Sequence, residues 1–197
     1  MTESRAERAI AVFDELNARD PVTLDVGGVA VPRELARADQ LTQWVLRLEP
    51  EPSEALRLAS RCQHLMRWTI ARSEFPEGRA GYHAWRRHAA RTHADRADAV
   101  LVELGYDPET RTELRRIVEK QGIARHRDVA TMEDALCLAF LEHDLEAFAH
   151  ERDDAHVIDV LRQTWNKMTP RGHALAAELL PLLPDRSRRL VALALGG

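Results

Sequence analysis

The sequence predicts an all-α fold in a single compact domain, and three features support this. Apolar residues recur with the period of an α-helix along nearly the whole chain. Segments that alternate like β-strands are nearly absent, and Pro, Gly or capping residues separate one helical segment from the next. The 197 residues contain no linker, repeat or low-complexity tract. One domain of about eight or nine helices, covering residues 1–197, is therefore the simplest interpretation.

The helical segments follow one another closely along the chain. They cover residues 4–18, 32–48, 53–72, 82–104, 107–122 and 131–151, followed by helices that start near residues 153, 169 and 185.

Caps and helix breakers define the first four of these helices. The first ends before Pro21, and the second starts at Pro32, a residue that suits the first turn of a helix, and ends before Pro50. Ser53 caps the third helix, and Gly105 follows the fourth, as glycine commonly does at a helix C-terminus. These boundaries come from backbone chemistry and are independent of the apolar period.

Three of the later helices start at a pair of residues that is typical of a helix N-terminus. Asp107-Pro108 opens the fifth, and Asp153-Asp154 and Thr169-Pro170 open the seventh and eighth. The sixth is apolar nearly all round from Met132 to Leu141, which predicts a buried central helix. Residues 22–32 alone alternate like a strand, with a glycine pair that favours a small hairpin.

Composition narrows the class of protein. A formal net charge of −4 gives no general attraction to nucleic acid or to an anionic membrane, so neither is expected as a partner. The two cysteines, Cys62 and Cys137, lie in apolar helical stretches, which fits a reducing compartment. The first residues form no secretory signal, and no apolar run approaches the roughly 20 residues that span a bilayer. We therefore expect a cytoplasmic protein.

The third predicted helix carries a row of polar side chains. Arg61, His64, Trp68 and Arg72 are spaced three, four and four residues apart, which places them on one face of a continuous helix. Long donors beside an imidazole can form an anion-binding surface. The alternative is a half-buried hydrogen-bonding seam between this helix and a neighbour.

The following segment adds more donors. Arg79 lies in a loop with several turn residues, and Tyr82, Arg86 and His93 share one face of the fourth helix. Such a loop can close over an anion, with Tyr82 available to stack on a ring. Alternatively, these arginines form exposed ion pairs with acids that are close in sequence, such as Glu77.

Two acids stand at the start of the predicted central helix. Glu133 and Asp134 fit a capping pattern after Thr131, and helix N-termini favour acids. Burying a carboxylate is costly unless a cation or donors face it. We expect His64, an arginine of the third helix or a metal to face one of them.

Several blocks of the chain resemble a known family. They read RCQHLMRW, IARSEFPEGRAGYHAWRR, THA, MEDALCLAFLE and TWNKM, in this order. Together they cover most of the chain and resemble the uncharacterised family called domain of unknown function 4202. The family carries no established activity that the resemblance can transfer.

A more distant similarity links the chain to HD-superfamily phosphohydrolases, helical enzymes that surround a divalent metal with His and Asp side chains. The stretch from His93 to Tyr106 is similar to one of their blocks, and Asp134 to the acid of their last motif. The resemblance implies an HD-like fold and a divalent metal of unspecified identity held by His64, His93 and Asp134. The His-Asp doublet expected between His64 and His93 is missing. The site is therefore either rebuilt, with Glu133 as an alternative ligand, or lost.

Two functions follow from these expectations. The first is a hydrolase of a phosphorylated small molecule or nucleotide, with His64 and Asp134 as catalytic residues. The ligand-binding residues would be Arg61, Arg67, Trp68, Arg72, Arg79, Tyr82 and Arg86. The second is a non-catalytic HD-like module that binds an anionic ligand or a protein partner.

Overall fold

The computed structural model describes residues 3–196 and consists of ten α-helices with one small hairpin in this range. The elements are α1 (Arg5–Asn17), β1 (Thr23–Val26), β2 (Val29–Pro32), α2 (Arg33–Leu48), α3 (Glu54–Cys62), α4 (Gly78–Glu103), α5 (Pro108–Val118), α6 (Arg127–Ala139), α7 (Leu145–His150), α8 (Asp154–Trp165), α9 (Pro170–Leu179) and α10 (Asp185–Leu195). Short 3-10 turns cover Arg67–Thr69, Arg72–Glu74 and Leu180–Leu182, and Phe140–Asp144 form a π-helical turn. The predicted all-α fold is confirmed.

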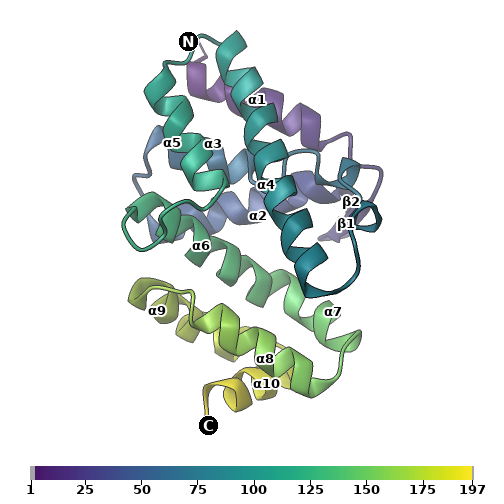
Figure 1. Ribbon diagram of the computed structural model, residues 1–197. Helices are drawn as coiled ribbons and strands as arrows, with labels where there is room; N and C mark the ends of the chain where they lie inside the picture. The colour runs from purple at the N-terminus through teal and green to yellow at the C-terminus, as the bar shows by residue number, and fades with distance from the viewer. Residues whose placement is uncertain (1–2, 197) are drawn as a thin grey trace.

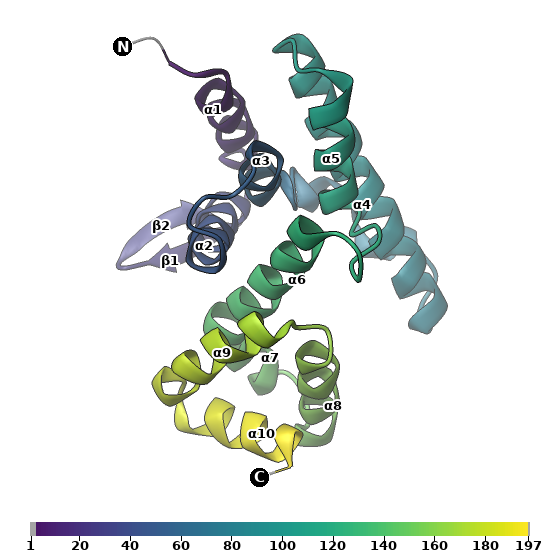
Figure 2. The same ribbon diagram turned by 90° about the vertical axis from the view of Figure 1, so that its left-hand side faces the viewer.

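Helix α6 lies at the centre of the molecule. Figures 1 and 2 show α1–α5 on one side of it and α8–α10 on the other. It packs against α2, α3 and α5 on the first side and against α9 on the second. Met132, Ala135 and Leu138 are fully buried, because they face neighbouring helices. The predicted central position of this segment is confirmed.

The predicted hairpin is also present. Strands β1 and β2 pair antiparallel, with Val26 opposite Val29. Gly27 and Gly28 form the turn with φ angles of 62° and 86°, a region that glycine enters without steric cost.

The sixth predicted helix differs from the observed one at its start, which is Arg127 and not residue 131, and in its second half. A π-helical turn follows α6, because the backbone N–H of Leu145 bonds to the carbonyl of Phe140, five residues earlier. This turn separates α6 from α7 and accounts for the helix beyond the predicted nine. Cys137 and Leu141 are buried as expected, whereas Leu136 and Phe140 are half-buried.

The prediction of one continuous helix over residues 53–72 was wrong. Helix α3 ends at Cys62. The Asn17 side chain donates to the Arg61 carbonyl over 2.9 Å, so this carbonyl no longer accepts the backbone hydrogen bond that would continue the helix. Met66 then adopts a left-handed φ of 54°. His64, Trp68 and Arg72 therefore do not continue the face that carries Arg61.

Among the helices of residues 3–196, none combines the length and the apolar character that a membrane span requires.

Candidate ligand-binding cavity

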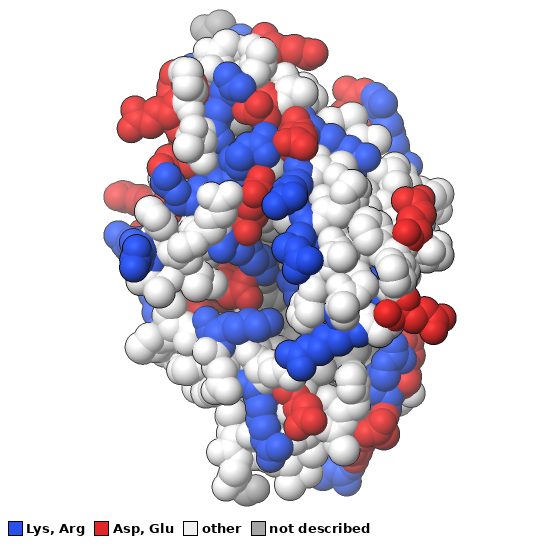
Figure 3. Space-filling view, viewed as in Figure 1, with Lys and Arg blue, Asp and Glu red and all other residues white. Residues whose placement is uncertain are grey.

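A cavity of about 970 Å³ opens between α2, α4, α6 and α8. It is large enough for a drug-sized ligand, since such sites typically enclose about 300–1,000 Å³. Figure 3 shows Lys and Arg side chains bordering a hollow near the centre of the face drawn there. The π-helical turn after α6 and the segment between α3 and α4 both contribute residues to its lining.

Basic side chains dominate the charge of this lining. Its basic residues are Arg37, Arg67, Arg86, Lys120, Arg152 and Lys167. Its acidic residues are Glu133 and Asp144. The lining therefore carries four more positive than negative charges, although the whole chain has a net charge of −4.

Two of these arginines have no acidic partner. Within residues 3–196, neither Arg67 nor Arg86 has a carboxylate oxygen within 4.0 Å. Their guanidinium groups instead lie over aromatic rings, Arg67 at 4.7 Å from the centroid of Trp85 and Arg86 at 5.9 Å from that of Tyr82. Burial lowers the pKa of Arg67, the negative charge of Glu34 opposes this shift, and the positive charges of Arg37 and Arg86 add to it. Like charges are thus crowded at one end of the cavity.

Lys120 and Glu133 form the main ion pair of the lining. The Lys120 Nζ lies 2.5 Å from a carboxylate oxygen of Glu133, and the Lys167 Nζ lies 4.0 Å from the other. Lys120 follows α5 with a positive φ of 58°, which is uncommon for a residue with a side chain. The prediction that Glu133 and Asp134 head the central helix was wrong, because α6 begins at Arg127 and both acids lie in its middle. Of the two, Glu133 lines the cavity.

His64 lines the cavity between the arginines. Burial, and then the charge of Arg67, hold the pKa of His64 well below its ordinary value, so its imidazole is neutral at pH 7. The ring of His93 lies edge-on behind it, with 6.0 Å between the ring centroids. His93 Nδ1 donates to the Leu65 carbonyl over 2.9 Å, and burial lowers the pKa of His93 to about 4. His93 therefore supports the backbone next to His64 and is not part of the lining.

The structure corrects the role expected of Asp134. Its carboxylate accepts hydrogen bonds from the backbone N–H of Thr169 at 2.8 Å and from the Thr169 hydroxyl at 2.5 Å. Gly172 packs so closely that an added Cβ would lie 2.5 Å from an Asp134 oxygen. Asp134 therefore accepts hydrogen bonds from the residue that caps α9 and is not part of the cavity lining.

The predicted metal ligands do not come together. Within residues 3–196, no three His, Cys, Asp or Glu side chains are arranged to hold a metal ion. His64 and His93 are neighbours, but Asp134 is bound to Thr169. The residues present thus do not fit a resident metal held by His64, His93 and Asp134.

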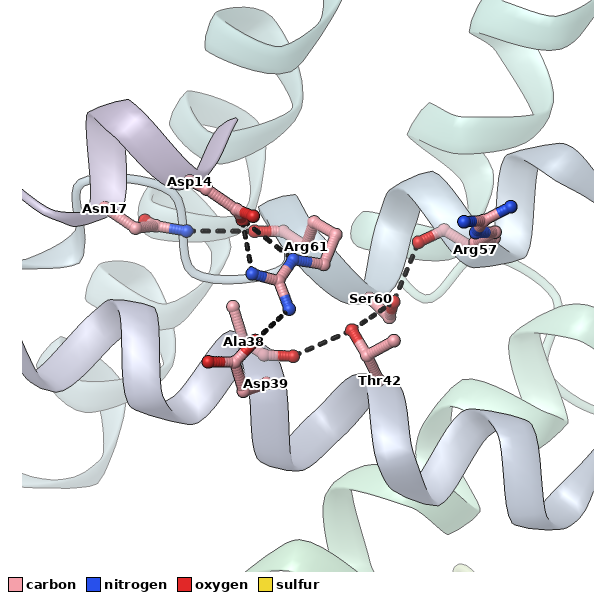
Figure 4. A network of polar contacts seen from close by, with 8 residues as sticks. All are labelled: Asp14, Asn17, Ala38, Asp39, Thr42, Arg57, Ser60 and Arg61. Atoms are coloured by element: carbon pink, nitrogen blue, oxygen red, sulfur yellow. Dashed lines mark hydrogen bonds and ion pairs between the residues drawn. The ribbon is translucent and has the colours of Figure 1, made fainter. Parts of the chain in front are cut away.

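Arg61, predicted to bind a ligand, instead links three helices. It is 7% exposed, and its guanidinium donates to Asp14 of α1 and Asp39 of α2 (Figure 4). The Nε–Oδ1 distance to Asp14 is 2.8 Å. Both acids come from helices far away in sequence, so the arginine spacing alone does not predict these pairs.

The other predicted ligand residues divide into two groups. Tyr82 lines the cavity together with His64, Arg67 and Arg86. Arg72 donates to the carbonyls of Phe75 and Pro76, each at 2.9 Å, and shapes the turn before α4. Two more residues lie outside the lining with Arg72. Arg79 is exposed and donates to His83, and Trp68 is half-buried.

Sequence reasoning missed four basic residues of the lining, of which Lys120 follows α5. Arg37 comes from α2, Arg152 follows α7, and Lys167 follows α8. Lys167 lies within the TWNKM block, which was a usable signal. Arg37 and Arg152 stand out only when the helices are packed together.

Comparison with known proteins decides the family. The family described as Domain of unknown function (DUF4202) matches residues 7–191. The chain belongs to the DUF4202 family. No curated protein and no solved structure matches it. The matched region of this DUF4202 protein contains every residue of the cavity lining.

Proposed function

We propose that this DUF4202 protein binds a phosphorylated small molecule in the cavity and hydrolyses its phosphate ester. The observation that carries the proposal is the unpaired state of Arg67 and Arg86 beside Lys120, in a lining with an excess of positive charge. Crowded like charges destabilise a fold unless an anion compensates them. Guanidinium groups form paired hydrogen bonds with phosphate oxygens, which makes a phosphate ester a well-matched anion.

His64 is the candidate general base. It is neutral at pH 7, and within residues 3–196 no hydrogen-bond donor or acceptor engages its ring. A water held beside it can attack phosphorus while its proton passes to the imidazole. The bound phosphate would raise the low pKa of His64, because its negative charge offsets that of the arginines.

The leaving oxygen also needs a proton when its bond to phosphorus breaks. Lys120 can donate it, because burial lowers the pKa of its ammonium group. Arg67 and Arg86 would stabilise the charge on the phosphoryl oxygens during the transfer. Each of these roles belongs to a side chain of the lining.

A phosphatase assay tests the hydrolytic part of the proposal. Purified protein is incubated with a panel of phosphate monoesters and released phosphate is measured, with EDTA or with added Mg²⁺ or Mn²⁺. The metal arms test the divalent metal that the HD resemblance implies. We expect activity on at least one ester, with a loss of about 10²-fold or more in His64→Gln. Equal rates in wild type and His64→Gln would contradict the role of His64.

The second candidate is a non-catalytic module that binds the same anionic ligand. The ion pair between Lys120 and Glu133 favours it, because each of these charged groups already has a partner in the lining. Binding of a phosphate ester without release of phosphate under any metal condition would select this function. Retention of binding in His64→Gln is expected under both readings, so turnover alone separates them.

A further inference from the structure

The lining of the cavity changes character along α6. Glu133 lies in the middle of the helix, paired with Lys120, and Phe140 begins the π-helical turn that follows its last residue. Seven residues separate the two positions, which corresponds to about 10 Å along a helix axis. A ligand that lies along this stretch of α6 therefore meets the Lys120–Glu133 pair and, seven residues further on, aromatic side chains.

The second end contains a cluster of aromatic rings. Phe140 and Phe148 meet edge to face with 5.7 Å between their centroids, and the ring of His156 lies 5.9 Å from that of Phe148. Both phenylalanines are only half-buried, and all three rings line the cavity. Leu136 and Val160 complete an apolar wall.

Polar groups at this end limit what can bind there. Gln40 and Gln163 lie in the lining with amide groups able to donate and accept hydrogen bonds. Arg37 pairs with Asp144 at 3.1 Å, and Arg152 lies 5.8 Å from the centroid of Phe148. Such a mixture suits a flat heterocycle with polar edges and disfavours an alkyl chain.

The volume supports a ligand larger than a sugar phosphate. A phosphate group held by Arg67 and Arg86 would leave the aromatic end of a cavity of about 970 Å³ unfilled. A ring that covers this apolar and aromatic surface removes it from water, which contributes favourable free energy to binding.

We propose that the ligand is a nucleotide, with its base against Phe140 and Phe148 and its phosphate between Arg67 and Arg86. This inference rests on the proposed function and specifies its substrate class.

Calorimetric titration with matched probes tests the inference. The probes are ribose 5-phosphate, the four common nucleoside 5′-monophosphates and the corresponding nucleosides. We expect at least one nucleotide to bind ten-fold or more tightly than ribose 5-phosphate, since stacking on aromatic side chains strengthens base binding by about this factor or more. Phe140→Leu, which keeps an apolar side chain, should remove most of this difference and leave ribose 5-phosphate affinity unchanged.

The outcomes separate the two proposals. Equal affinities for ribose 5-phosphate and all four nucleotides would overturn the inference and leave a phosphate-binding cavity in place. Failure of every phosphorylated probe to bind would overturn both. Nucleosides that bind as tightly as nucleotides would keep the aromatic site and remove the phosphate site. Far-UV circular dichroism of Phe140→Leu establishes that the variant is folded.

Discussion

At the scale of the residue, burial sets the charge of the two neighbouring histidines. His93 is 1% exposed, and its Nε2 has no hydrogen-bond partner in residues 3–196. Its pKa of about 4 lies below the unfolded value of 6.5, so the folded state favours the neutral ring. The resulting stabilisation is complete above pH 6.5 and is lost as the pH falls from 6.5 to 4.

Replacing His93 by asparagine should make stability less sensitive to acid. Asn keeps a donor for the Leu65 carbonyl but does not titrate. Between pH 7 and pH 4, wild type should lose about 3 kcal/mol more unfolding free energy than His93→Asn, as the pKa shift requires. Urea unfolding at several pH values measures this. His88→Asn, an exposed control, should follow wild type, and a parallel profile for His93→Asn would refute the burial argument.

Asp134 offers a second test at this scale, because its two hydrogen bonds to Thr169 assign it a structural role. Asp134→Ala should lower the unfolding free energy by about 3 kcal/mol, since it removes hydrogen bonds to a charged acceptor. Phosphate-ester affinity of the folded fraction should stay unchanged. The exposed Asp159→Ala serves as control and should shift stability by less than about 0.5 kcal/mol. If Asp134→Ala lost phosphate-ester binding without a change in unfolding free energy, Asp134 would be a ligand-binding residue and not a structural one.

At the scale of the element, periodicity predicted most helices and the hairpin but not the end of α3. The capping residues Ser53 and Asp107 act within one turn, so the chain nearby is sufficient to predict them. The end of α3 depends on Asn17, which lies 44 residues before Arg61. A local sequence pattern cannot predict a contact between residues so far apart in the chain. The helical face predicted to carry His64 and Arg72 is therefore absent.

Asn17→Ala should therefore disturb both stability and ligand binding. The side chain is 1% exposed and also accepts a bond from the Met66 backbone N–H over 3.4 Å. Removing it leaves buried backbone groups unpaired, at about 1–3 kcal/mol. His64 and Arg67 flank Met66, so phosphate affinity should weaken as well. Denaturant unfolding and calorimetry measure the two effects, with the exposed Asn166→Ala as control. Unchanged affinity would show that this segment is positioned by other contacts.

At the scale of the whole molecule, α6 separates two groups of helices (Figure 2). The cavity draws its lining from both groups. The sequence indicated His64, Arg67, Tyr82 and Arg86, which come from one side. Arg152 and Lys167 come from the other side, and only the packing of α8 brings them in. The site was therefore half predictable: residues in one stretch of chain could be found, whereas those contributed by distant helices could not.

The dissociation constant of a phosphate ester from wild type and from Arg67→Gln/Arg86→Gln tests the central claim most directly. Calorimetry with ribose 5-phosphate should show one site in wild type and an affinity at least ten-fold lower in the double variant, because charged hydrogen bonds contribute about 1.5–3 kcal/mol each. Arg79→Gln, outside the lining, should bind as wild type does. Equal affinities in all three proteins, or no binding to wild type, would contradict an anion site in this cavity.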